Sequence, residues 1–133
     1  MPALVPDLLS LLRAHLLVRS LRVVHYDETP RGRTELKVRC RLAGGYQFQV
    51  WLYHEPTFQD YAYQLFSDHP ILRWDNAPHY PNVTTAPHHF HSEANEVSAS
   101  PLCGDPLVDL PYVLAEIEKW MTDRKLGSAT TSL

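Results

Sequence analysis

The chain has 133 residues, of which 44% are hydrophobic and 20% are charged, and its formal net charge at pH 7 is −3. These values are those of one ordinary globular domain, and they argue against a two-domain enzyme and against a fold that needs metal or disulfide bonds for stability. We therefore expect a single domain over residues 1–133, with a frayed tail at about 126–133. The composition is unusual in its 8 His and 11 Pro.

The cysteines and the start of the chain bear on the compartment. Cys40 and Cys103 are the only cysteines and form no close pair, so neither a disulfide scaffold nor a zinc knuckle is expected. The first residues lack the features of a secretory signal, and no apolar run approaches the roughly 18 residues of a membrane span. The sequence predicts a soluble, cytoplasmic protein with no membrane partner.

The net charge conceals a division along the chain. Between Arg13 and Arg41 there are eight Lys or Arg against three Asp or Glu, whereas from Ser92 to the end there are three against seven. A basic front half could face phosphates, so the overall charge does not exclude nucleic acid as a partner. Two solvated faces of opposite sign explain the pattern equally well.

The first half of the chain predicts a helix followed by strands. Residues 7–16 carry leucines at helical spacing, with Asp7 as the expected N-cap, and residues 18–28 are rich in β-branched side chains. Residues 35–42 alternate between charged and apolar side chains, and Gly44-Gly45 then suits a two-residue hairpin turn. Residues 46–53 continue as the partner strand, with tryptophan and tyrosine on its outer face.

The second half completes the expected fold. Residues 58–66 alternate again, and a turn leads to a short strand at 71–74. After an irregular stretch of about thirty residues, Asp105-Pro106 marks the start of an amphipathic helix that Gly127 is expected to end. Because proline is tolerated only in a first turn, Pro111 leaves a start at Asp109 open as well. The predicted fold is α+β: a curved antiparallel sheet of about five strands in a meander, with a short N-terminal helix at an edge and a C-terminal helix packed on one face.

The irregular stretch begins with the segment in which we expect chemistry. Four of the eight histidines lie there among prolines and follow an arginine and an aspartate; the set is Arg73, Asp75, His79, His88, His89 and His91. Arginine can hold a phosphate with two hydrogen bonds, and imidazole exchanges a proton near neutral pH. One histidine could take a proton from an attacking hydroxyl and another could protonate the leaving oxygen, while Asp75 could orient either His79 or one of the later three.

Two other interpretations of this segment stay open. If residues 88–91 are extended, His89 and His91 project to one side and could bind a metal ion, with His79 or Asp75 as a further ligand. The spacing matches no known zinc or iron signature. Alternatively, these residues only shape the loop, with Asp75 and Asn76 capping turns and the histidines packing or hydrogen-bonding at the surface.

A second set of residues, on the strands before the loop, could bind nucleic acid. Arg39 and Arg41 could follow a phosphate backbone, and Trp51, Tyr53 and Tyr61, together with Tyr63, could stack on bases. A solvated strand face explains the arginines at least as well. Packing against the terminal helix is the more common role of such aromatic side chains.

The run Arg73-Trp74-Asp75-Asn76-Ala77-Pro78-His79, followed by Pro87-His88-His89-Phe90-His91, resembles the signature of the TumE family of small prokaryotic toxin–antitoxin proteins. The layout is also similar over residues 17–122, with strands and Tyr61-Ala62-Tyr63 before the motif and a closing helix after it. The lysine common in the family's last His-rich element is replaced here by Phe90, which removes one phosphate contact.

The resemblance implies the toxin of a type II module, neutralised by direct contact with a cognate antitoxin that carries a DNA-binding helix-turn-helix domain. Because many small toxins of this size cleave mRNA, RNA is the expected substrate by analogy. Our hypothesis is a metal-independent endoribonuclease that needs no cofactor. Arg73 would bind phosphate, Asp75 would orient, and two of His79, His88, His89 and His91 would be acid and base. A non-enzymatic interaction module and a His-ligated metalloprotein are the alternatives, and a homodimer is compatible with all three.

Overall fold

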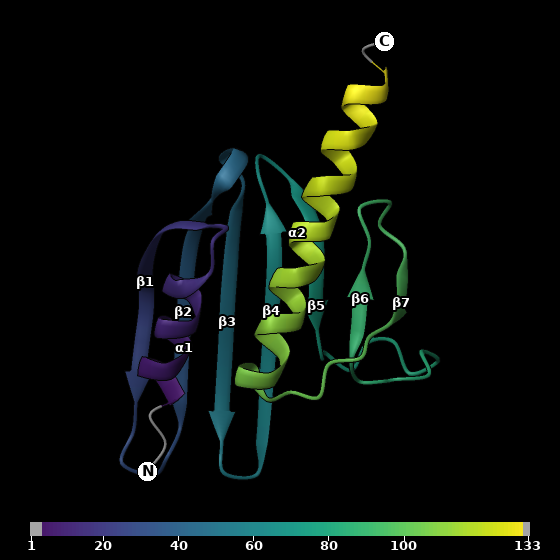
Figure 1. Cartoon of the computed structure of the whole chain (residues 1–133). Coiled ribbons are helices and arrows are strands. Elements are labelled where there is room, and N and C mark those ends of the chain that lie inside the picture. The colour runs from purple at the N-terminus through teal and green to yellow at the C-terminus, as the bar shows by residue number, and fades with distance from the viewer. Residues whose placement is uncertain (1–3, 132–133) are drawn as a thin grey trace.

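The computed structural model describes the backbone of residues 4–131 and the side chains of residues 4–57 and 59–126. One helix precedes a sheet and a second helix follows it (Figure 1). The elements are α1 (Leu4–Ala14), β1 (Val18–Glu28), β2 (Thr34–Leu42), the 3-10 turn η1 (Ala43–Gly45), β3 (Gln47–Glu55), β4 (Phe58–Phe66), β5 (Pro70–Asp75), β6 (His89–His91), β7 (Val97–Ala99) and α2 (Pro106–Thr131). None of the described helices is both long and apolar enough to cross a membrane.

The strands form one sheet in the order β1-β2-β3-β4-β5-β6-β7, and every neighbouring pair is antiparallel. The connections are therefore local, and the sheet is open rather than closed into a barrel (Figure 1). The predicted α+β meander is confirmed. The predicted count of about five strands is too low, because β6 and β7 lie in the stretch after Asp75 that shows no periodicity.

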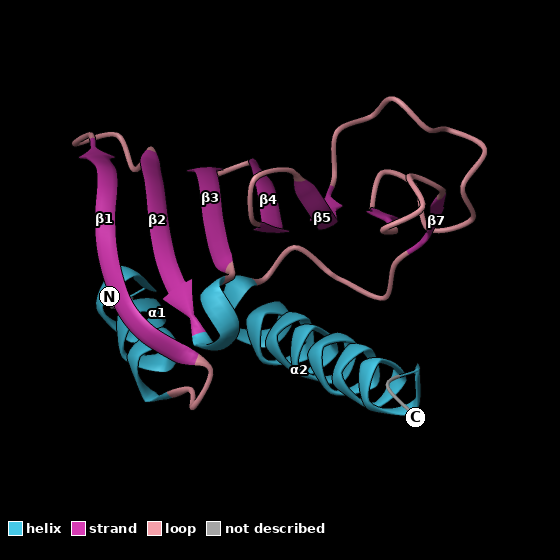
Figure 2. Cartoon of the chain, turned by 90° about the horizontal axis from the view of Figure 1, so that it is seen from above, coloured by secondary structure: helices cyan, strands magenta, loops and turns pink. Residues whose placement is uncertain are grey.

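Both helices lie on the same face of the sheet (Figure 2). Apolar side chains of β2, β3 and β4 alternate toward them and form a core with α1 and α2, in which Leu12, Val38, Phe48 and Leu114 are fully buried. α1 lies over β1 and β2 and α2 over the later strands (Figure 1), so the N-terminal helix contributes to the core rather than only flanking an edge. In the part of the chain that the structure describes, the opposite face carries no helix; we call it the open face.

Several boundaries differ from the prediction for physical reasons. α1 begins at Leu4, because Pro6 is tolerated in a first turn, and Asp7 lies inside that turn instead of capping it. Gly44 and Gly45 have φ of 80° and 82°, as expected, but the connection is longer than two residues, since β3 begins only at Gln47.

The structure confirms the first of the two predicted starts of α2 and shows that its predicted end was wrong. The Asp105 Oδ1 atom accepts a hydrogen bond from Leu107 N at 3.1 Å, and Pro106 is the first helical residue. α2 continues through Gly127 to Thr131, since a glycine costs only about 1 kcal/mol inside a helix. Residues 132–133 of the expected frayed tail lie outside the described residues.

Candidate functional site

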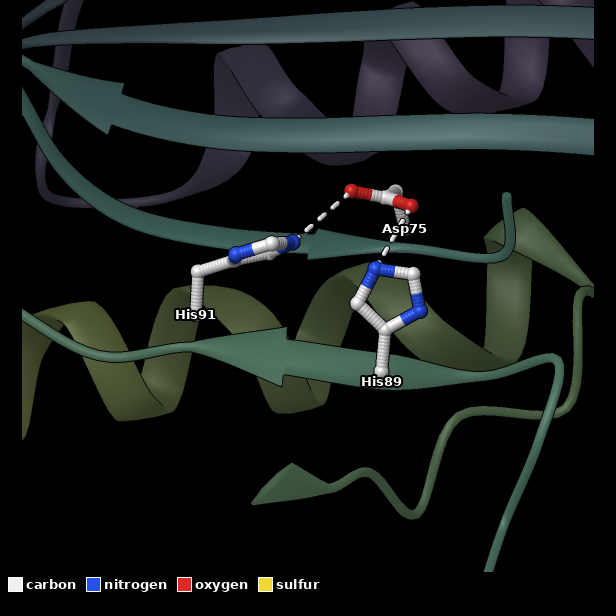
Figure 3. A group of neighbouring side chains, drawn as sticks. All are labelled: Asp75, His89 and His91. Atoms are coloured by element: carbon white, nitrogen blue, oxygen red, sulfur yellow. Dashed lines mark ion pairs between the residues drawn. The ribbon is translucent and has the colours of Figure 1, made fainter. Parts of the chain in front are cut away.

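The last residues of β5 and the short strand β6 bring three chemically active side chains together on the open face. In the antiparallel register Arg73 pairs with His91 and Asp75 pairs with His89. Side chains of directly paired residues lie on the same side of a sheet. Figure 3 shows the result: the two imidazoles of β6 point at the carboxylate of Asp75.

Asp75 is the centre of this group. Its Oδ1 atom lies 3.0 Å from His89 Nε2 and accepts a hydrogen bond from Ala77 N at 2.9 Å. Its Oδ2 atom accepts a hydrogen bond from Arg73 Nε at 2.8 Å and lies 3.4 Å from His91 Nε2. Only 6% of the Asp75 side chain is exposed. A buried carboxylate is stable only where it is paired and hydrogen-bonded, and these contacts meet that requirement.

His89 holds Asp75 and has no nitrogen left for a substrate. Its side chain is 1% exposed, its Nδ1 atom lies 2.9 Å from the carbonyl oxygen of Pro87, and its Nε2 atom faces Asp75. A carbonyl and a carboxylate can only accept hydrogen bonds, so His89 satisfies both contacts when both of its nitrogens carry protons.

His91 is the accessible imidazole of the group. Its side chain is 21% exposed, and among residues 4–126 no partner contacts its Nδ1 atom. Burial lowers the pKa of His91 below its ordinary value, and the charges of His89 and Arg73 lower the pKa further, while Asp75 offsets part of the shift. His91 is therefore neutral at pH 7, with Nε2–H directed at Asp75 and the Nδ1 lone pair free.

The site borders hollows in the open face. His91 and Arg73 line a hollow of about 480 Å³ together with Gln64 and Glu93. Arg73 also lines a second hollow of about 190 Å³ beside Asp75 and Trp51. A ligand in either hollow would reach the guanidinium group, and one in the larger hollow would also reach His91.

Two residues of the site were not singled out from the sequence. Gln64 Oε1 accepts a hydrogen bond from Arg73 Nη1 at 2.9 Å. Because Gln64 lies between the buried Tyr63 and Leu65 on one strand, the alternation of side chains predicts that it faces outward. The Tyr80 ring covers both site histidines, with ring centroids 4.7 Å from His89 and 5.7 Å from His91. Tyr80 lies in the irregular loop, where no periodicity marks its direction.

The structure separates the four loop histidines. His88 alternates to the helix-covered face, where its Nδ1 atom lies 2.7 Å from the hydroxyl oxygen of Tyr61. His79 is exposed, and the contact seen for it among the described residues is its backbone N–H on the carbonyl of Ala77. Only His89 and His91 reach Asp75. A single site containing all four histidines, as the sequence analysis allowed, does not form.

The expected nucleic-acid-binding residues are also divided. Arg39, Arg41, Trp51 and Tyr53 lie on the open face, since their paired neighbours alternate with the buried core positions. Tyr61 is 1% exposed on the helix-covered face and stacks on Tyr63 with ring centroids 5.0 Å apart. Tyr61 therefore belongs to the core, and no joint stacking platform with Trp51 forms.

The cluster also has the donor set of a metal site. One ligand atom each of Asp75, His89 and His91 lie within 4.8 Å of one another. Two imidazoles and a carboxylate suit zinc or iron, and the backbone carbonyl on His89 Nδ1 is a common orienting contact for a ligating histidine. Arg73 opposes this use, because its guanidinium group already neutralises the same carboxylate at 2.8 Å.

Comparisons with known proteins place these features in a family. A family model described as Toxin TumE matches residues 8–121, which include every strand of the sheet and all residues of the site. No curated protein and no solved structure matches the chain.

Proposed function

The chain belongs to the TumE toxin family, and from this premise we propose that it is a toxin that cleaves RNA without a metal ion at the Arg73–Asp75–His91 site. Membership of a toxin family implies an antitoxin partner. We further propose that this antitoxin carries a helix-turn-helix domain and that the toxin acts in the cytoplasm. The observation that carries the cleavage proposal is a neutral, accessible imidazole beside a fixed cation.

His91 is the proposed general base. Asp75 holds the Nε2–H tautomer, so Nδ1 can take the proton from a ribose 2′-hydroxyl group. The 2′-oxygen then attacks the adjacent phosphorus and the bond to the 5′-oxygen breaks, which leaves a 2′,3′-cyclic phosphate and a 5′-hydroxyl end. The contact to Asp75 stabilises the imidazolium that forms, as a carboxylate does in other histidine-based sites.

Arg73 is the proposed phosphate ligand. Its Nε atom donates to Asp75 and its Nη1 atom donates to Gln64, so two contacts hold the guanidinium plane in place. The Nη2 group has no partner among residues 4–126 and can donate to a non-bridging phosphate oxygen. A cation fixed before the reaction stabilises the charge that builds up on phosphorus.

His79 is the proposed general acid for the leaving 5′-oxygen. His88 contacts Tyr61 on the other face and both nitrogens of His89 are occupied, so His79 is the remaining loop histidine that can reach solvent. It precedes Tyr80, whose ring lies over His91. Replacement of His79 by alanine should therefore slow cleavage less than replacement of His91, because water can supply the proton in its place.

The test uses purified protein, a 5′-labelled single-stranded RNA and buffer that contains EDTA. We expect the wild type to cleave the RNA, His91→Ala to cleave about 10²–10⁴-fold more slowly, and an oligonucleotide with 2′-deoxyribose throughout to stay intact. His25→Ala is the matched control, because His25 is an exposed histidine on β1, far along the sheet from β6. Equal cleavage by His91→Ala and wild type would contradict the proposal. Intact RNA at every pH from 5 to 8 would favour the interaction module instead.

A metal-dependent activity is the second candidate, because the three ligand atoms lie within 4.8 Å of one another. Elemental analysis of protein purified without a His-tag separates the two. One equivalent of zinc or iron, lost in Asp75→Ala together with activity, would support the metal site. Undiminished cleavage by protein dialysed against EDTA would support the metal-independent reaction.

A further inference from the structure

One row of polar side chains crosses the open face from the first strand to the active-site strand. The register pairs each residue with the next, in the order Arg22, Arg39, Gln49, Gln64, Arg73, His91 on β1 to β6. We call these six residues the donor row. Since neighbouring strands lie about 4.8 Å apart, the donor row is about 24 Å long. It ends at the proposed base and phosphate ligand.

The donor row offers hydrogen-bond donors and few acceptors. Gln49 Oε1 accepts from Arg39 Nη2 at 2.7 Å and from Arg39 Nε at 3.2 Å, and Gln64 Oε1 accepts from Arg73. A guanidinium group has no acceptor, so each amide must turn its oxygen to the arginine and its NH₂ group away from it. The surface formed in this way suits a ligand with regularly repeated anionic acceptors.

Hollows and aromatic rings line the donor row. Arg39, Gln49 and Gln64 border a hollow of about 260 Å³ with Phe66 on its wall. Gln64 also borders the hollow of about 480 Å³ at His91. Trp51 borders the hollow of about 190 Å³ at Arg73, so the three depressions follow one another along the row through shared walls. Phe66 and Trp51 lie on opposite sides of the row, because Gln49 pairs with Gln64 between them.

The charge of this part of the sheet is positive although the chain as a whole is negative. Lys37 and Arg41 flank Arg39 on β2 with the same side-chain direction, and Arg22 lies opposite Arg39 on β1. Asp68 lies on the wall of the hollow of about 260 Å³, and its Oδ1 atom lies 2.7 Å from His69 Nδ1. The basic segment of the sequence is thus concentrated at the end of the donor row that is distant from His91.

We propose that the donor row is the track for the sugar–phosphate backbone of single-stranded RNA, with unpaired bases stacking on Trp51 and Phe66. The proposal rests on the proposed function and names its substrate class. Repeated phosphates match a row in which donors predominate, and partly exposed aromatic rings beside such a row favour bases whose faces are free. A duplex hides those faces and would leave the rings without a role.

Binding is tested separately from cleavage, with a fluorescent single-stranded RNA made resistant by 2′-O-methyl groups and with anisotropy as the readout. We expect Arg39→Glu to raise the Kd about 10-fold or more, and Arg39→Gln to lower the slope of log Kd against log salt by about 0.7, the loss of one phosphate contact. Trp51→Ala should weaken binding about 5- to 100-fold with the salt slope unchanged, as expected for the loss of stacking. The charge-matched control is Arg13→Glu, on α1 at the other face, which should bind like the wild type.

The outcomes separate this inference from the cleavage proposal. Binding that depends on Arg39 and Trp51, in a protein that leaves unmodified RNA intact, would support the track and contradict the ribonuclease. Equal Kd values for wild type, Arg39→Glu and Trp51→Ala would overturn the track even if the protein cleaves RNA. Tighter binding of duplex RNA than of the single strand, or equal displacement of the RNA by polyglutamate, would overturn it as well.

Discussion

Strands β1 to β5 and strands β6 to β7 belong to one sheet, but different interactions hold them there. Strands β2 to β5 bury regular rows of apolar side chains under α1 and α2, and Val18 and Leu21 of β1 pack against this core partly buried. β6 and β7 have three residues each, and polar contacts hold much of this segment. Thr85 Oγ1, for example, donates to His88 O at 2.8 Å and accepts from Ser100 N at 2.9 Å. The apolar contact of Phe90 with Trp74, with ring centroids 4.9 Å apart, joins the two parts.

The candidate site lies on the boundary between these two parts of the sheet. Arg73 and Asp75 come from the core-supported strand β5, whereas His89 and His91 come from the locally held strand β6. A hydrogen-bonded contact between two strands positions side chains to a fraction of an ångström only if both strands are held. The comparison therefore predicts two kinds of effect. Substitutions at the polar contacts of β6 should reduce RNA cleavage, and substitutions on the core-facing side should reduce the free energy of unfolding alone.

The largest effect is expected from Asp75→Asn, which removes the charge that joins the two parts. It leaves His89 and Arg73 without their common anion, so we expect a loss of about 3–5 kcal/mol in the free energy of unfolding, together with loss of RNA cleavage. Urea unfolding monitored by tryptophan fluorescence and a cleavage assay measure the two effects. Asp123→Asn, an exposed aspartate on α2 at the other face of the sheet, is the control. An unfolding free energy within 1 kcal/mol of wild type would show that Asp75 does not join the strands.

The pH dependence of cleavage tests the β6 side of the boundary alone. Because the pKa of His91 lies below its ordinary value, the neutral base is present at pH 7 and is lost only as the pH falls through that lowered pKa. The rate should therefore decline only below about pH 6.5, whereas the residual rate of His91→Ala should lack this decline. If the cleavage rate of the wild type already falls while the pH is lowered from 8 to 7, the assignment of His91 as the base is contradicted.

A smaller effect, on stability alone, is expected at the histidine of the other face. His88→Ala removes the contact with the buried Tyr61 hydroxyl and should lower the free energy of unfolding by about 1–3 kcal/mol. Cleavage per folded molecule should stay within about two-fold of wild type, since His88 does not reach the open face. Single-turnover cleavage at a temperature where the variant is folded makes the measurement. A loss comparable to that of His91→Ala would place His88 in the reaction.

The smallest effect is expected from Tyr61→Phe, which keeps the ring stacked between Tyr63 and His88 and removes one hydroxyl group. We expect a loss of about 1 kcal/mol in stability and no change in RNA binding, because Tyr61 lies in the core. Thermal unfolding and anisotropy with the resistant RNA would check both. Weaker RNA binding by Tyr61→Phe would contradict a purely structural role and would indicate that Tyr61 contacts the substrate.

Where the sequence has a regular period, it predicted the structure well. The strand at 58–66 coincides with β4, and the alternation of residues 46–53 correctly predicts that Trp51 and Tyr53 lie opposite the core. Three-residue strands have no measurable period, so β6 and β7 could not be predicted from the sequence. Tyr61 is a different case, because the sequence analysis names it both as a base-stacking residue and as a core residue. Its aromatic character suits both roles, and only its pairing with the inward-facing Leu52 decides its face.

The unusual histidine content by itself determined where the candidate site would be sought, and the alternation of an extended segment determined that His89 and His91 would share a side. Only the tertiary structure decided that this side is the one with Asp75, that His88 faces the core, and that Asp75 contacts His89 and His91. The physical reason is that local spacing sets the direction of a side chain relative to its own strand. The strand with which a segment pairs after a long loop is set by the assembly of the whole sheet, and no local sequence pattern encodes that register.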